Sequence, residues 1–147
     1  MSPRSYRNNN PGNLDSGQPW RGLMPTERLS DDQKSEPRFA VFEAPQWGFR
    51  AMAVLLQNYF KLYNRNTVRL IVTRWAPPTE NNTEAYIAAV AHEAGVKPDD
   101  VLHPDGGTLF KIIKAITRHE TGSWEPYWHD ADLAQGLELA GVAAYVA

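Results

Sequence analysis

The spacing of apolar residues predicts that most of the chain after residue 44 is helical. Hydrophobic side chains recur there every three or four positions, which is the period of an amphipathic helix. The pattern predicts five helices, over residues 45–63, 67–75, 82–94, 108–121 and 132–145. The residues expected on the inner faces of the first three helices are Phe49, Met52, Leu56, Tyr59 or Phe60, Tyr63, Val68, Ile71, Val72, Trp75, Tyr86, Ile87, Val90 and Ala91.

Several residues mark where these helices begin and end. Pro45 suits the first turn of a helix, because its missing N–H is not needed there. Either Asn81 or Asn82 can cap the third helix, and Gly95 can end it. Thr108 is predicted to cap the fourth helix, after a turn over residues 103–107.

The first 48 residues lack this helical period. They are rich in Pro, Gly, Asn and Ser, which favour turns. Alternating and aromatic residues predict two short strands, at 20–24 and 38–43, joined by a polar loop at 26–37. The fold class predicted is therefore mainly α (α+β), as a single domain over residues 1–147 with a small β or irregular lobe at its N-terminus.

Composition narrows the classes of function. The chain has 147 residues, of which 42% are hydrophobic and 22% charged, as expected for one globular domain. Its net charge of −2 gives no general attraction to nucleic acid. It has no cysteine, which excludes disulfides and thiol catalysis. Neither a signal peptide nor an apolar run of ~20 residues is visible, so we do not expect insertion into a membrane. We also expect a monomer.

Glu120 is the most informative candidate for catalysis. The apolar positions Leu109, Ile113 and Ile116 share one helix face, and Glu120 continues that face at its C-terminal end. Burial and the negative end of the helix dipole both disfavour a charged carboxylate. A carboxyl group that stays protonated can serve as a general acid. The alternative is that Glu120 ends a helix in solvent, where it could pair with Arg118.

Glu80 is a second candidate, in the polar loop before the third helix. Its neighbours fit an ordinary helix start, with a capping Asn and an acidic first turn, and that structural role is an open alternative. The four histidines show no close metal-ligand spacing, and we expect neither a metal nor another cofactor. No nucleophile motif of the Gly-x-Ser-x-Gly type and no phosphate-binding glycine loop is present.

The stretch RNNNPGNL, residues 7–14, concentrates amides near the N-terminus. Asn side chains both donate and accept hydrogen bonds, which suits a neutral polar ligand. Asn and Pro-Gly are also common turn residues, so a plain surface turn is the alternative.

Four segments together resemble a family of small phage proteins related to the lytic protein of double-stranded-RNA bacteriophages. They are RNNNPGNL, FAVFEAPQWGFRAMAVLL, RWAPPTENNTEAYI and AITRHETG. The resemblance covers roughly residues 6–141 and implies a lysozyme-like fold that degrades peptidoglycan. The segments also resemble bacterial glucosaminidases and lytic transglycosylases, but in rotated order, with the Glu-bearing helix last. This order implies a circular permutation.

The resemblance implies a muramidase or lytic transglycosylase that acts on peptidoglycan glycan strands. It implies Glu120 as the acid/base, with Glu80 as its competitor; a hydrolase would use Glu80 or Glu43 as a second carboxylate. The residues expected to line the glycan groove are Asn9, Asn10, Asn13, Trp75, Asn82, Tyr86 and Trp124. A non-catalytic virion protein and a peptidoglycan endopeptidase are the alternatives. The protein would reside in a virion or in the host cytoplasm before it acts on the periplasmic cell wall.

Overall fold

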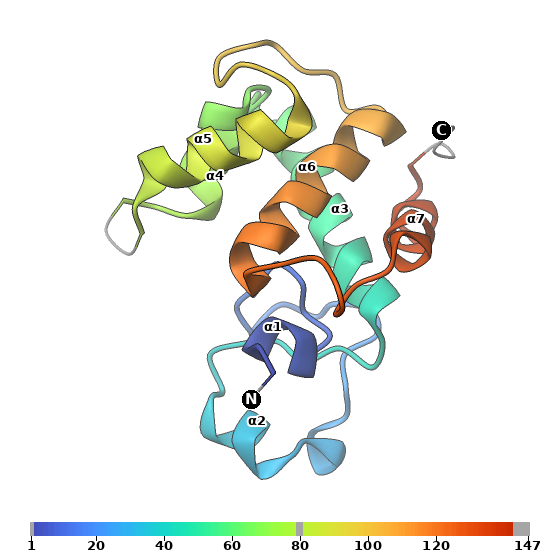
Figure 1. Cartoon of the computed structure of the whole chain (residues 1–147). Coiled ribbons are helices and arrows are strands. Elements are labelled where there is room, and N and C mark those ends of the chain that lie inside the picture. The colour runs from blue at the N-terminus through green and yellow to red at the C-terminus, as the bar shows by residue number, and fades with distance from the viewer. Residues whose placement is uncertain (1, 79–80, 143–147) are drawn as a thin grey trace.

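The computed structural model describes residues 2–78 and 81–142, and it is mainly helical (Figure 1). The five predicted helices are present as α3 (Pro45–Tyr63), α4 (Val68–Trp75), α5 (Thr83–Ala94), α6 (Gly106–Thr121) and α7 (Asp130–Leu139). No helix in the described part of the chain is long and apolar enough to cross a membrane.

Helix α6 is central to the packing (Figure 1). It contacts α3, α5, α7 and the short helix α1 (Arg4–Arg7), while α7 packs along α3 and α4 packs on α5. The main core forms where these helices meet, and burial of its apolar side chains is the dominant favourable term in folding. Its fully buried members include Phe49, Met52, Leu56, Val68, Ile71, Leu109, Ile113, Ile116 and Leu133.

The predicted inner faces are largely confirmed. Tyr86, Ile87, Val90 and Ala91 of α5 are all buried. The exception is Tyr63 at the end of α3, which is 61% exposed because the last turn of the helix extends beyond the core.

Two helix starts differ from the prediction. Helix α6 begins at Gly106, because the side chain of Asp105 accepts a hydrogen bond from the Thr108 N–H and acts as the cap. Thr108 is thus not the cap. Residues 106 and 107, which were predicted to lie in a turn, belong to the first turn of α6. Helix α7 begins at Asp130 and ends at Leu139, so the predicted range 132–145 was shifted; residues 143–147 lie outside the described range.

The N-terminal lobe is more helical and less regular than predicted. The expected loop at 26–37 contains the 3₁₀-helix η1 (Thr26–Arg28) and α2 (Asp31–Ser35), which Ser30 caps. Within residues 2–78 and 81–142, the expected strands reduce to two isolated antiparallel bridges, Asp15 with Phe39 and Leu23 with Phe42. Segment 38–43 nonetheless lies between residues 8–16 on one side and residues 22–24 on the other. It forms isolated backbone hydrogen bonds with both segments.

Candidate active site

The Asn-rich stretch folds into a compact loop whose backbone explains part of its composition. Asn9 and Asn13 both have φ of 49°, in the left-handed region. Asn tolerates this region better than most residues with a side chain. Asn9 also donates from Nδ2 to the carbonyl of Phe42, which fastens the loop to the extended segment 38–43. Two of the asparagines are therefore suited to turn the chain.

The side chain of Asn10 is buried inside the same loop and stabilises it through hydrogen bonds. Its side chain is 0% exposed. Its Nδ2 donates to the carbonyls of Leu14 at 3.0 Å and Ala40 at 2.9 Å, and its Oδ1 accepts from the Leu14 N–H at 2.9 Å. Within the described residues, the Leu14 N–H and the Ala40 carbonyl have no other hydrogen bond, whereas the Leu14 carbonyl also accepts from the Ala40 N–H. The prediction that Asn10 contacts a substrate is therefore wrong, because its amide is buried and fully used.

Two glycines let the loop approach neighbouring elements closely. A Cβ at Gly48 in α3 would lie 2.2 Å from the backbone oxygen of Asn9. A Cβ at Gly12 would lie 2.7 Å from Cζ2 of Trp75, at the end of α4. Both positions need a residue without a side chain. The loop is thereby placed against α3 and beside Trp75, with Asn13 at its far end.

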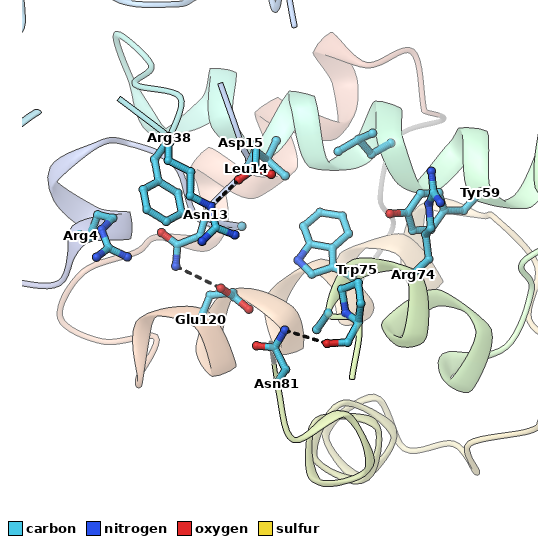
Figure 2. Close-up of a pocket in the computed structure, with 15 residues that line it drawn as sticks. Arg4, Asn13, Leu14, Asp15, Arg38, Tyr59, Arg74, Trp75, Asn81 and Glu120 are labelled. Atoms are coloured by element: carbon cyan, nitrogen blue, oxygen red, sulfur yellow. Dashed lines mark hydrogen bonds and ion pairs between the residues drawn. The ribbon is translucent and has the colours of Figure 1, made fainter. Parts of the chain in front are cut away.

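Glu120 lies in the last turn of α6 and receives two hydrogen bonds. Asn13 donates from Nδ2 to Oε1 at 3.1 Å, across 107 residues of sequence (Figure 2). The hydroxyl of Tyr86 donates to Oε2 at 2.8 Å from helix α5. Each carboxyl oxygen therefore has its own donor, and the group is held in one orientation. The expected meeting of the Asn loop and Glu120 is confirmed for Asn13.

Asn13 has unused hydrogen-bonding capacity. Its Oδ1 is buried and accepts no hydrogen bond from the described residues. An unsatisfied buried acceptor carries a free-energy cost of about 1–3 kcal/mol. The position beside Glu120 is thus one where a donor from a ligand, or from a rearranged neighbour, would be stabilising.

Tyr86 lies behind the carboxyl group rather than in the wall of a groove. It is only 1% exposed, and its ring stacks on His119 with centroids 3.8 Å apart. Burial, followed by the nearby charge of Glu120 and the hydrogen bond to it, raises the pKa of Tyr86 well above its ordinary value. Tyr86 was predicted to line the groove and instead orients the candidate acid.

This raised pKa predicts a late-titrating tyrosine. The folded state favours the neutral phenol, so the stability that Tyr86 contributes is complete below about pH 10 and is lost as pH rises through the raised pKa. In an alkaline titration followed by tyrosinate absorbance, Tyr86→Phe is expected to remove a component that ionises late. Tyr63→Phe, at an exposed position, is the control and should leave that late component in place. If Tyr86→Phe instead removed a part of the absorbance change that occurs early in the titration, this assignment would be wrong.

The C-terminal end of α6 is braced from two directions. The Thr121 Oγ1 accepts a hydrogen bond from Nε1 of Trp128 at 3.0 Å and lies 2.8 Å from Oγ of Ser5 in α1. Ser5 is buried, and Gly122 ends the helix with φ of 100°. These contacts connect α1, α6 and the following turn, so the residue next to Glu120 is firmly positioned.

A groove with a volume of about 660 Å³ opens beside Glu120. In the view of Figure 2, Arg4 and Arg38 lie at one end, Tyr59 and Arg74 lie at the other, and Glu120 and Trp75 lie between them. This volume falls in the range typical of ligand sites. The lining residues are Arg4, Gly12, Asn13, Leu14, Asp15, Arg38, Phe39, Leu55, Tyr59, Arg74, Trp75, Ala76, Pro77, Asn81 and Glu120.

The groove carries more positive charge than the whole chain suggests. Three arginines line it, against the two acids Asp15 and Glu120, whereas the chain has a net charge of −2. Arg4 pairs with Glu36 and Arg38 pairs with Asp15. Carboxylates thus neutralise two of the three arginines that line the groove.

The predicted site residues divide into those near the groove and those elsewhere. Asn13, Trp75 and Glu120 line it. Asn82 instead caps α5 by accepting from the Ala85 N–H, which is the structural role left open for this run. Asn9 is likewise occupied with the backbone of the lobe.

Trp124 is also not a wall of the groove. It is 5% exposed and packs against Phe49 in the main core, with ring centroids 5.8 Å apart. The expectation that it stacks on a ligand is wrong, because its apolar surface is buried among the helices. Glu80 lies outside the described residues.

Among the described residues, no group of three His, Asp or Glu side chains could hold a metal ion. Glu43, considered as a second carboxylate, is exposed, forms an ion pair with Arg28 and does not line the groove.

No pattern in the sequence indicates the basic and aromatic residues that line the groove. Arg4, Arg38 and Arg74 come from three separate segments and converge only in the folded chain. Phe39 and Tyr59 were identified as strand and core residues, and nothing in their spacing marks them as groove residues. Asn81 could have been found, because it adjoins the loop in which a site was already expected.

Comparison with known proteins gives one clear relative. The chain is 34% identical over 139 residues to Protein P5 of Pseudoalteromonas phage PM2. The match covers 92% of this chain and 80% of the phage protein. No family model matches the chain.

Proposed function

The chain belongs to the same family as Protein P5 of Pseudoalteromonas phage PM2, and from the site around Glu120 we propose that it cuts the glycan strand of bacterial peptidoglycan. The bond cleaved would join N-acetylmuramic acid to N-acetylglucosamine. The observation that carries this proposal is a carboxyl group with a separate donor on each oxygen, in the wall of a groove of about 660 Å³. An oriented acid beside an open groove suits acid/base chemistry on a long substrate.

Glu120 would act first as acid and then as base. Its carboxyl proton passes to the glycosidic oxygen as the bond from that oxygen to the anomeric carbon breaks. The acetamido group of the sugar stabilises the positive charge that develops on the ring. The resulting carboxylate then takes a proton from the hydroxyl group that attacks the anomeric carbon. Asn13 and Tyr86 keep the carboxyl group in place through both steps.

A single-acid reaction is favoured over one that needs two carboxylates. Among the described residues the only other acid that lines the groove is Asp15, and it is paired with Arg38. With no free second carboxylate among the described groove residues to activate water, we propose that the sugar itself supplies the attacking hydroxyl. We therefore favour a lytic transglycosylase, which leaves anhydro-sugar ends, over a muramidase.

The fold would be a circularly permuted version of the lysozyme-like domain. The hydrogen bond between Asn13 and Glu120 supports this, since it joins an N-terminal loop to a C-terminal helix as the rotated order requires. Nearness of the chain ends gives no support, because α1 and the end of α7 lie in different parts of the molecule (Figure 1). As a relative of a phage protein, the chain would be carried in a virion or made in the host, and would act on the cell wall.

Product analysis tests the proposal. Purified peptidoglycan is digested with the protein, and the soluble fragments are identified by mass spectrometry. Anhydro-muramic ends are the expected result, whereas reducing ends would show a muramidase. Freed peptides would instead identify an endopeptidase. Binding to the polymer without release of any fragment would indicate a non-catalytic virion protein and overturn the proposal.

A further inference from the structure

A second, smaller hollow lies on the N-terminal lobe, with a volume of about 280 Å³. It is lined by one short irregular segment and by one residue of α3, and none of these residues lines the groove beside Glu120. The lining residues are Gln18, Pro19, Trp20, Arg21 and Arg50. Two arginines thus converge on a hollow that the proposed reaction does not use.

Arg50 is poorly satisfied where it lies. Its Nε is buried and has no hydrogen-bond acceptor. Burial and, after it, the positive charge of Arg21 lower the pKa of Arg50. A buried donor without an acceptor and two neighbouring cations both cost free energy.

Neither arginine forms an ion pair with a carboxylate in the described part of the chain. Arg21 instead lies over the ring of Trp47, 5.3 Å from its centroid. Five other arginines do have such partners, namely Arg4, Arg28, Arg38, Arg69 and Arg118. Arg21 and Arg50 are therefore left with free donors at the same hollow, which an anion could satisfy.

We propose that Arg21 and Arg50 form a binding site for a carboxylate, carried by the peptide part of peptidoglycan. The planar guanidinium group matches a carboxylate with two parallel hydrogen bonds. Trp20 and Pro19 add an apolar wall for the carbon atoms next to that carboxylate. The identity of the polymer rests on the proposed function, whereas binding of the anion does not.

The groove and the hollow both adjoin one small apolar cluster. Trp20 packs on a small cluster formed by Leu14, Ala40, Phe42 and Ala51, and so do Leu55 and Trp75 of the groove. On the proposed function, the glycan lies in the groove and a carboxylate of the peptide part binds the two arginines.

Anion binding is tested first, without the polymer. Sodium acetate and inorganic phosphate are added separately to the protein, and the five tryptophan indole N–H signals are followed by NMR. Acetate is expected to shift signals at the hollow, and Arg50→Gln should abolish that shift. Lys61→Gln removes one positive charge at an exposed position of α3 and should leave it intact. If acetate shifts the signals of Arg50→Gln as much as those of the parent, the proposed site is wrong. If phosphate shifts them and acetate does not, the assignment to a carboxylate is wrong.

The stability of the free protein gives a second measurement. Because Arg50 is unsatisfied in the absence of a ligand, Arg50→Gln is expected to raise the Tm by about 3 °C. A purely structural arginine would have the opposite effect, so a clear fall in Tm would count against the site.

Co-sedimentation with purified peptidoglycan then tests the polymer. The Glu120→Gln variant is the parent, so that the polymer stays intact. Adding Arg21→Gln and Arg50→Gln is expected to weaken binding about tenfold, and amidation of the peptide carboxyl groups should do the same to the parent. If the parent fails to bind while acetate still shifts the NMR signals, the proposed function fails and the anion site stands. If the parent binds and the arginine changes have no effect, the polymer assignment is wrong.

Discussion

Replacing Glu120 with Gln is expected to lower the rate of peptidoglycan cleavage by about 1,000-fold, because an amide cannot donate and recover the proton that the reaction needs. The chain should remain folded. The Gln oxygen can accept from the Tyr86 hydroxyl, and its Nε2 can donate to the Oδ1 of Asn13 if that amide turns over. This rearrangement satisfies an acceptor that is otherwise unpaired. Clearing of a cell-wall suspension measures activity, and thermal unfolding measures the fold.

Two other variants make the Glu120 result specific. Glu125→Gln removes the same charge five residues later, at an exposed position outside the groove, and should keep full activity. Glu80→Gln tests the competing candidate. If Glu80→Gln were inactive and Glu120→Gln active, the assignment of the acid would be wrong. If all three variants cleared the suspension equally, the chemistry would lie elsewhere.

The long helices could be predicted because each has a regular apolar face and clear end signals. Helix α3 runs from Pro45 to Tyr63 as its pattern indicates. The start of α6 was harder, since Asp105 and Thr108 are both good cap residues and only one can hold that position. Two glycines after Asp105 favoured a turn, but the cap and the buried Leu109 favour a helix.

The site could be predicted only where it depends on local spacing. Glu120 was found because it continues the face of Leu109, Ile113 and Ile116, which is a property of one helix. Its contact with Asn13 spans 107 residues and has no local signal, so it came from the resemblance alone. Neither local spacing nor the resemblance indicated that three arginines converge on the groove.

Sequence alone could not separate the roles of neighbouring asparagines. Asn10 and Asn13 have the same side chain, but one is buried in the loop and the other faces Glu120. Asn9 and Asn13 have left-handed backbone conformations, and nothing in the run of identical residues marks which positions adopt them. An Asn-rich motif near a site therefore contains both supporting and contacting residues.

Asn10→Ala is expected to be the most destabilising single change in this loop, with a loss of about 3–5 kcal/mol in the free energy of unfolding. It leaves the Leu14 N–H and the Ala40 carbonyl without a partner, at a cost of about 1–3 kcal/mol for each buried group. The Leu14 carbonyl loses one hydrogen bond but keeps the one from the Ala40 N–H. Stabilities of such domains are only about 5–15 kcal/mol, so the Tm should fall by roughly 10 °C or more. Denaturant titration gives the free energy directly.

Asn81→Ala is the matched control, because this exposed side chain makes one longer hydrogen bond, to the carbonyl of Pro77 at 3.3 Å. It should change stability by less than about 0.5 kcal/mol. Asn10→Asp provides a sharper test, since it keeps the shape but turns an oxygen toward the carbonyls of Leu14 and Ala40. That variant should be less stable at pH 7 than at pH 4, where a protonated carboxyl group can still donate to one carbonyl. If Asn10→Ala were as stable as the parent, the loop would not depend on this amide, and the position of Asn13 beside Glu120 would need another cause.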